Sequence, residues 1–244
     1  ELGCTNVAFG NDNSQNADCT NVGFFGCFII TGGNGNNQNI DCTNTGSCTT
    51  GVAGDDNSQN VDCTNAGALG CTAGAFGNDN SQKIECKDIG IDGCLSSVVG
   101  NDNVQNMDCT DVGAAGCLNL ANGDGNTQQK ILCSSVGDDG CINIGGTGNG
   151  YSQSIKCLSM ASGCLNSTNG DSNDQKLVCV HSTKCSNNIF PTSSSNTQNT
   201  VCVKSGTCLN DGTDTKVISV GSNSCKSDIP GTTTICANGR IITR

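Results

Sequence analysis

The chain has 244 residues, with 21 cysteines, 34 glycines, no tryptophan and a formal net charge of −11. So few aromatic residues cannot build the thick apolar core of an ordinary globular domain, and the acidic balance argues against a basic nucleic-acid-binding surface. Residues 1–122 hold 14 acidic and 2 basic residues and residues 123–244 hold 8 and 9, so the halves contribute −12 and +1 to the total of −11. This asymmetry suits a polar rod that associates head to tail.

The cysteine content predicts the compartment. Cysteine makes up about 9% of the chain, which is typical of disulfide-bonded proteins in oxidising environments. We therefore expect a secreted protein, extracellular or at the cell surface, whose leader was removed before residue 1. No apolar run reaches 18 residues, so we expect no membrane span.

A unit of about 23 residues recurs nine times along the chain, and each unit carries two cysteines. A fixed period in this range predicts a stacked repeat architecture. The first cysteines of the units are Cys19, Cys42, Cys63, Cys86, Cys109, Cys133, Cys157, Cys179 and Cys202.

Taken in chain order, the first unit predicts the elements of all the others. Residues 10–13 form a turn rich in Gly, Asn and Asp, and residues 15–20 follow as a strand with alternating inner and outer side chains. Gly23 marks a second turn, and residues 27–30 form a second strand. We therefore expect an all-β solenoid of about ten coils over residues 1–210, with two short strands per coil. Residues 211–244 are expected to form an irregular cap or a contact with a neighbouring subunit.

One glutamine per unit lies on the inner face of the first strand, together with the apolar residue and the first cysteine. Stacked coils would bring these amides into a hydrogen-bonded ladder, which compensates the cost of burying them. Between residues 109 and 133 either Gln128 or Gln129 can take this position. The other predicted members are Gln15, Gln38, Gln59, Gln82, Gln105, Gln153, Gln175 and Gln198.

The Gly-x-x-Asn-x-Gln spacing, the inward glutamine and the period resemble the curlin repeats of bacterial functional amyloid fibres. The resemblance covers residues 10–202 and implies two strands per coil, Asn/Gln ladders and assembly into extracellular fibres. Two features of this chain depart from the curlin pattern. Curlin units lack the paired cysteines, and their second Gln/Asn column is weak in this sequence.

The second cysteine of each unit follows the first by six to eight residues, across one glycine-centred turn. This spacing favours pairing within a coil, while pairing between coils (4–19, 27–42 and so on) stays an alternative. Thiolate metal sites are disfavoured because the spacing is not Cys-x2-Cys. The within-coil bridges would be Cys19–Cys27, Cys42–Cys48, Cys63–Cys71, Cys86–Cys94, Cys109–Cys117, Cys133–Cys141, Cys157–Cys164, Cys179–Cys185 and Cys202–Cys208.

Three cysteines remain outside this scheme. Cys4 has the position of a second cysteine, and Cys236 has that of a first, so the chain begins and ends halfway through a coil. This predicts a bond between Cys236 of one subunit and Cys4 of the next. The alternative is a Cys225–Cys236 bridge inside a C-terminal cap, which leaves Cys4 unpaired.

The residue before the first cysteine is acidic in five successive units and points outward. These residues, Asp18, Asp41, Asp62, Glu85 and Asp108, are candidate calcium ligands or simply a solvated acidic face. The outward residue after the first cysteine is often threonine, which suggests ice binding, but Lys87 and Leu158 interrupt that column. Asn166 begins the one strict glycosylation sequon and is expected in an exposed turn.

Catalysis has almost no support in the sequence. His181 is the only histidine, and no nucleophile is placed distinctively beside it. We therefore predict a non-enzymatic structural subunit of a secreted filament or matrix, without a cofactor, whose partner is another copy of itself. The alternative is a monomeric extracellular binding or adhesion solenoid that binds calcium or ice.

Overall fold

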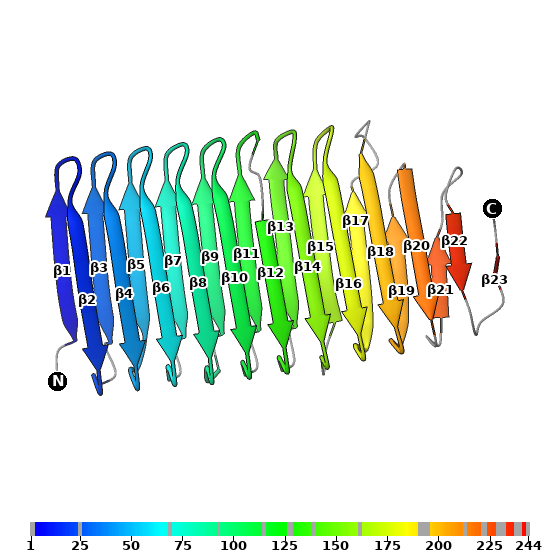
Figure 1. Cartoon of the computed structure of the whole chain (residues 1–244), viewed down its shortest axis with the longest axis horizontal. Helices are drawn as coiled ribbons and strands as arrows, with labels where there is room; N and C mark the ends of the chain where they lie inside the picture. The colour runs from blue at the N-terminus through cyan, green and yellow to red at the C-terminus, as the bar shows by residue number, and fades with distance from the viewer. Residues whose placement is uncertain are drawn as a thin grey trace.

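A computed structural model shows the chain as an all-β solenoid, with its strands stacked along one long axis (Figure 1). The structure describes residues 3–23, 26–67, 70–91, 93–113, 116–125, 129–137, 140–160, 163–189 and 196–211. Beyond residue 211 it describes the backbone of the strands alone. This confirms the predicted all-β solenoid class.

The strands form two sheets, one of 11 and one of 12 strands. The 11-stranded sheet contains, in spatial order, β1 (Cys4–Phe9), β3 (Cys27–Gly32), β5 (Cys48–Ala53), β7 (Cys71–Phe76), β9 (Cys94–Val99), β11 (Cys117–Asn122), β13 (Cys141–Thr147), β15 (Gly163–Asn169), β17 (Lys184–Ile189), β19 (Thr207–Asp211) and β21 (Ser224–Ser227). The 12-stranded sheet contains β2 (Ser14–Thr20), β4 (Asn37–Thr43), β6 (Ser58–Thr64), β8 (Ser81–Lys87), β10 (Val104–Thr110), β12 (Gln129–Ser134), β14 (Ser152–Leu158), β16 (Asp174–Val180), β18 (Thr197–Val203), β20 (Asp214–Val220), β22 (Thr233–Cys236) and β23 (Ile241–Ile242).

Each strand from β1 to β20 pairs in parallel with the strand one coil further along the chain. The register follows the sequence repeat, so that Cys19 pairs with Cys42 and Gln15 with Gln38. One irregularity interrupts the 11-stranded sheet, where the register between β13 and β15 shifts between Ile144 and Thr147. The final pair differs in direction, because β23 runs antiparallel to β22. Two strands per coil of about 23 residues therefore describe the stack as predicted.

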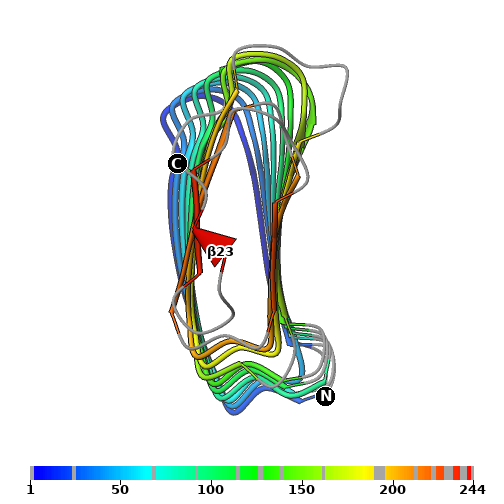
Figure 2. The same ribbon diagram turned by 90° about the vertical axis from the view of Figure 1, so that its right-hand side faces the viewer.

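Viewed along its axis, the solenoid is a flattened slab with two sheet walls joined by turns (Figure 2). The coils lie almost on top of one another, with a small progressive rotation. Flat sheets of many strands usually need side-chain ladders to hold them, and such ladders run through this slab, as described below.

The turns explain why Gly, Asn and Asp recur. The second residue after each first cysteine has a positive φ, as at Asn21 (57°), Asn44 (52°) and Asn65 (53°), a conformation that Asn adopts more readily than most residues. At Gly93 a Cβ atom would lie 2.0 Å from the carbonyl oxygen of Gly116. Glycine is therefore required at Gly93, because the next coil leaves no room for a side chain.

The core is thin and changes in chemistry across the slab. Cystines fill one end of each coil, and a column of aliphatic side chains lies next to them. Its members include Ile40, Val61, Ile84, Ile131 and Leu177, each no more than 1% exposed. A second, smaller apolar cluster contains Val52, Ala75, Val98, Ala121 and Tyr151. Amides are buried as well, so hydrogen bonds and disulfides supplement a small apolar contribution.

Candidate functional site

The glutamine ladder is the longest side-chain network of the chain. Each side-chain Nε2 donates to the Oε1 of the glutamine one coil earlier, as from Gln38 to Gln15 (3.0 Å) and from Gln59 to Gln38 (3.0 Å). The chain of donors continues through Gln82, Gln105, Gln153, Gln175 and Gln198. All the donors point toward the N-terminal end, so the ladder has a direction along the stack.

Gln129 takes the position that the sequence left open. It donates to Gln105 (2.9 Å) and accepts from Gln153 (2.7 Å). Gln128 lies outside the described residues. At the N-terminal end, Gln15 donates to the side-chain oxygen of Asn6 (3.1 Å).

The glutamine ladder is also tied to the opposite sheet. The Thr50 hydroxyl donates to Gln38 (2.8 Å), and the Ser96 hydroxyl donates to Gln82 (2.9 Å). These hydroxyls project inward from β5 and β9. The ladder therefore links the two walls of the slab as well as successive coils.

A second ladder runs through the turns and was not recognised from the sequence. The side-chain oxygen of Asn36 accepts from the backbone N–H of Asn13, and the same contact repeats from Asn36 to Asn57 and from Asn57 to Asn80 at 2.8–2.9 Å. Asn36, Asn57 and Asn80 are each 1% exposed. The sequence feature that marks this ladder is the asparagine two residues before most of the glutamines. It was interpreted only as a residue typical of turns.

A further column of buried amides lies on the inner face of the 11-stranded sheet. Asn119, Asn143, Asn166 and Asn187 are all 0% exposed and pair in register from β11 to β17. The expectation of a weak second Asn column is therefore wrong for this half of the chain. The sequence does not show this column plainly, because the matching positions in earlier coils are Ile29, Thr50, Ala73 and Ser96.

This placement also corrects the prediction for Asn166. The side chain was expected in an exposed turn, but it lies in the middle of β15 and is fully buried. A cluster of Asn, Ser and Thr is typical of a loop, but in β15 alternate residues of the cluster face the interior. A glycan has no room at Asn166 in the folded chain.

Nine disulfides join the first and second cysteine of each coil, with Cα–Cα separations from 6.1 Å (Cys19–Cys27) to 6.7 Å (Cys109–Cys117). These are the pairs that the spacing of six to eight residues favoured. Each bridge connects a strand of the 12-stranded sheet to the next strand of the other sheet. Sulfur atoms of neighbouring coils come within 4.8 Å, so the cystines form a stacked column. Nine disulfides indicate an oxidising environment.

Cys4 stands apart from these bridges. It is exposed and free, and it pairs in register with Cys27 at the end of the column of second cysteines. Cys225 and Cys236 lie in β21 and β22, and their side chains fall outside the described part of the structure. The stack places the two termini at opposite ends (Figure 1), so a Cys4–Cys236 bond is possible only between subunits.

The five acidic residues form one outward column on the 12-stranded sheet. Asp18, Asp41, Asp62, Glu85 and Asp108 pair in unbroken register from β2 to β10. Partial burial, together with the carboxylates of Asp41 and Glu85, raises the pKa of Asp62 above its ordinary value of 3.8, and Lys83 opposes this. The strand spacing therefore brings like charges close enough to oppose ionisation.

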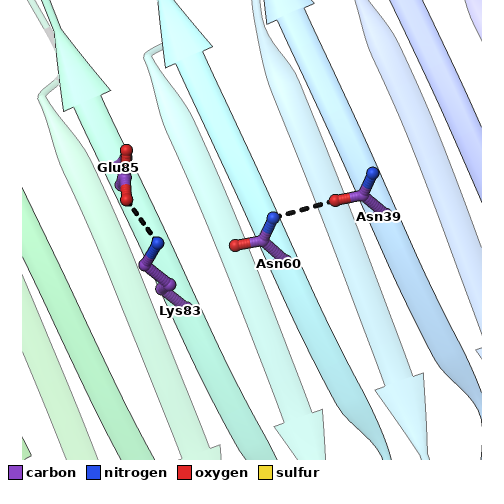
Figure 3. A network of polar contacts seen from close by, with 4 residues as sticks. All are labelled: Asn39, Asn60, Lys83 and Glu85. Carbon is purple, nitrogen blue, oxygen red and sulfur yellow. Dashed lines mark hydrogen bonds and ion pairs between the residues drawn. The ribbon is translucent and has the colours of Figure 1, made fainter.

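Two features relieve the repulsion in this column. Lys83 forms an ion pair with Glu85 (Figure 3). Next to this ion pair, Asn60 donates a hydrogen bond to Asn39 (2.8 Å) in an exposed amide ladder. Thr20 and Thr43 donate to Asp18 (2.8 Å) and Asp41 (3.1 Å). The face is therefore a ladder of charges and amides rather than a set of isolated carboxylates.

The linear spacing limits what the acidic column can bind. Within the described residues, the groups of three candidate ligand atoms that lie within 4.8 Å of one another consist of disulfide cysteines alone. Carboxylates on adjacent strands lie one strand spacing apart, so two of them can approach one ion. The third carboxylate of the column lies a further strand spacing away. A calcium ion here would bridge two neighbours and complete its coordination with water.

Comparison of this chain with protein-family models, with curated proteins and with solved structures finds no match. The described residues form no apolar helix of membrane-spanning length. The chain is thus a disulfide-rich repeat β-solenoid with internal amide ladders.

Proposed function

We propose that this chain is a structural subunit of an extracellular filament or matrix. The observation that carries the proposal is the glutamine ladder, which runs in one direction from Gln15 to Gln198. Along this ladder each coil offers the same donors and acceptors to its neighbours. The glutamine column ends where Gln198 pairs in register with Thr215, so another copy would be added through backbone strand pairing. The nine disulfides favour an extracellular setting, and the likeness to curlin repeats in period and inward glutamine supports a fibre.

Growth is proposed to occur head to tail. In the sheet orders, β1 and β2 have a hydrogen-bonded neighbour on one side only, and such edges invite pairing. Cys236 extends the column of first cysteines, because it pairs in register with Ser219, which pairs with Cys202. In an end-to-end stack, Cys236 and the next copy's Cys4 take the positions of the two cysteines of one coil.

Electron microscopy of the purified, non-reduced chain tests this proposal, with a non-reducing gel of the same sample. We expect fibres that lengthen with protein concentration and a ladder of disulfide-linked oligomers. The Cys4→Ser variant is expected to lose the covalent ladder and keep the fibres, since strand pairing carries the joint. Short rods of constant length at every concentration would contradict head-to-tail growth.

The acidic column favours a second candidate, a monomeric extracellular binding or adhesion solenoid that takes up calcium. This function predicts that calcium raises the thermal midpoint of short rods relative to EDTA. Asp62→Asn would reduce that increase, because it leaves only the pairs Asp18–Asp41 and Glu85–Asp108, whereas Asp174→Asn, outside the column, would leave it unchanged. Ice binding is less well supported, because Lys87 follows Thr64 in the register of the threonine column.

A further inference from the structure

The outer face of the 11-stranded sheet carries no charged residue from β1 to β15. Eight successive strands, each of six or seven residues, contain no Asp, Glu, Lys or Arg. Several large apolar side chains on this face are strongly exposed, namely Val7 (49%), Phe9 (80%), Phe28 (41%), Phe76 (60%) and Val99 (42%). They form two groups, one on β1 and β3 and one on β7 and β9, and exposed apolar groups on an uncharged sheet face mark an interaction site.

The opposite face of the slab behaves differently. There the outward positions carry the acidic column and several lysines, as on a surface that stays in water. Two copies that met through this face would oppose five acidic residues to five. The charge distribution therefore leaves the 11-stranded sheet as the face on which a second copy can pack.

The available area suits a stable pair. Eight strands at about 4.8 Å spacing and about 20 Å in length give roughly 760 Å² per copy, or about 1,500 Å² for both. Specific protein interfaces of standard size bury about 1,200–2,000 Å². Successive coils are rotated progressively with respect to one another (Figure 2), as in the twisted sheets that pack face to face in proteins.

Side-chain size changes along the face. One outward column starts with Val7 and Ile30, falls to Gly51 and Gly74, and rises again through Ser97 to Leu120 and Ile144. A Cβ atom at Gly74 would meet nothing within 4 Å, so the column is hollow there.

The neighbouring outward column repeats this change. It runs from Phe28 through Thr49 and Thr72 to Leu95, Leu118 and Ile142. Strands β5 and β7 are thus low, and strands β9 and β11 are high.

We propose that this face packs against the same face of a second copy, related by a two-fold axis that lies parallel to the strands between β7 and β9. Such an axis places the partner's β11 over β5 and its β9 over β7. Leu120 of the partner then enters the hollow at Gly51, and Leu118 of the partner covers Thr49. The high strands β9 and β11 of each copy cover the low strands β7 and β5 of the other, and isologous contacts of this kind close a dimer.

Mass measurement of the non-reduced chain tests the pairing independently of end-to-end growth. Short rods are expected at 49.2 kDa, twice the 24.6 kDa of one chain, by light scattering. Fibres are expected at twice the mass per unit length of a single solenoid. A single-solenoid mass at every concentration would overturn the proposal, even if long fibres form.

Substitutions on the two faces locate the interface. Leu118→Lys should halve the mass, because the pairing would bury two unpaired charges. Thr110→Lys is the matched control on the opposite face one strand earlier, where Lys87 is the register neighbour, and it should leave the mass unchanged. Pairing that survives Leu118→Lys would place the contact elsewhere and overturn the inference.

A size exchange tests the two-fold arrangement. Gly51→Leu fills the hollow and should abolish pairing, while the double variant Gly51→Leu, Leu120→Gly should restore it. The backbone at Gly51 accepts a side chain, since its Cβ would contact only Ile30 at 3.9 Å. Circular dichroism of each variant shows whether the slab has folded. A folded double variant that stays unpaired would exclude this axis.

Discussion

At the scale of single residues, the buried amides set the stability of the stack. Gln82 donates to Gln59 (2.6 Å) and accepts from Ser96 (2.9 Å) and Gln105 (3.4 Å). A ladder of this kind holds only while every member finds its partners, because an unpaired buried polar group costs more than a single bond contributes.

Gln82→Leu keeps the volume and removes the amide, so Gln59 Oε1 loses its donor and the Ser96 hydroxyl loses its acceptor. We expect a loss of about 2–3 kcal/mol in the free energy of unfolding. Asn60→Ala is the control, because its amide bonds lie in an exposed ladder, and we expect a loss below about 0.5 kcal/mol. Non-reducing denaturant titrations measure both, and equal losses would contradict an internal role for the ladder.

Asp62 gives the acidic column a pH dependence. Its pKa is raised on folding. Between pH 3.8 and the raised pKa, the folded chain therefore binds more protons than the unfolded chain. The free energy of unfolding falls as pH rises through this range. Asp62→Asn should therefore raise the thermal midpoint at neutral pH, and the gain should disappear well below pH 3.8 and shrink in high salt. A gain that is independent of pH would point to packing instead of charge.

At the scale of elements, β23 is the exception to the parallel stack. It pairs antiparallel with β22, through Ile235 with Ile242 and Cys236 with Ile241. The strand thus occupies the edge on which the next copy's β2 would pair during head-to-tail growth. Figure 2 shows β23 at this end of the slab.

Removal of residues 239–244 is expected to speed fibre growth, because it leaves the hydrogen-bonding groups of β22 unoccupied. Growth is followed by light scattering at matched protein concentration. Gly3→Ser cannot serve as a control, since a Cβ there meets Gly26. The exposed turn substitution Asn34→Asp serves instead, because Asp55 already holds the same ladder position. An unchanged or slower rate after the deletion would mean that β23 does not block the edge.

At the scale of the whole molecule, covalent bonds replace a missing core. The described interior has thin apolar columns beside the cystines and a second small apolar cluster. Each bridge closes a loop of about eight residues and contributes about 2.5 kcal/mol in the chain-entropy account, so nine contribute on the order of 20 kcal/mol. That sum exceeds the net stability of about 5–15 kcal/mol of ordinary domains.

We therefore expect the reduced chain to stay unfolded. The chain is reduced in denaturant, transferred to buffer with reductant and examined by circular dichroism and limited proteolysis. The non-reduced chain, carried through the same denaturant, is the control and should recover its β spectrum. Recovery of the β spectrum and of protease resistance in the reduced chain would show that the ladders alone suffice.

The sequence by itself determined the repeat, the strand alternation, the inward glutamines and the spacing that favours within-coil disulfides. These features are local, because the period fixes which residues of successive coils meet and the alternation fixes which face they take. Asn166 was not placed correctly, because an asparagine is typical of a turn or loop until its neighbours in adjacent coils are known.

The tertiary structure alone decided between Gln128 and Gln129, exposed the second amide column and separated a charged face from an uncharged one. It also placed β23 antiparallel at the end of the stack. Each of these depends on how two sheets from distant residues face each other. The alternation within one strand does not show which outward residues meet, and only the stacking of many coils makes one outer face an uncharged surface with exposed apolar side chains.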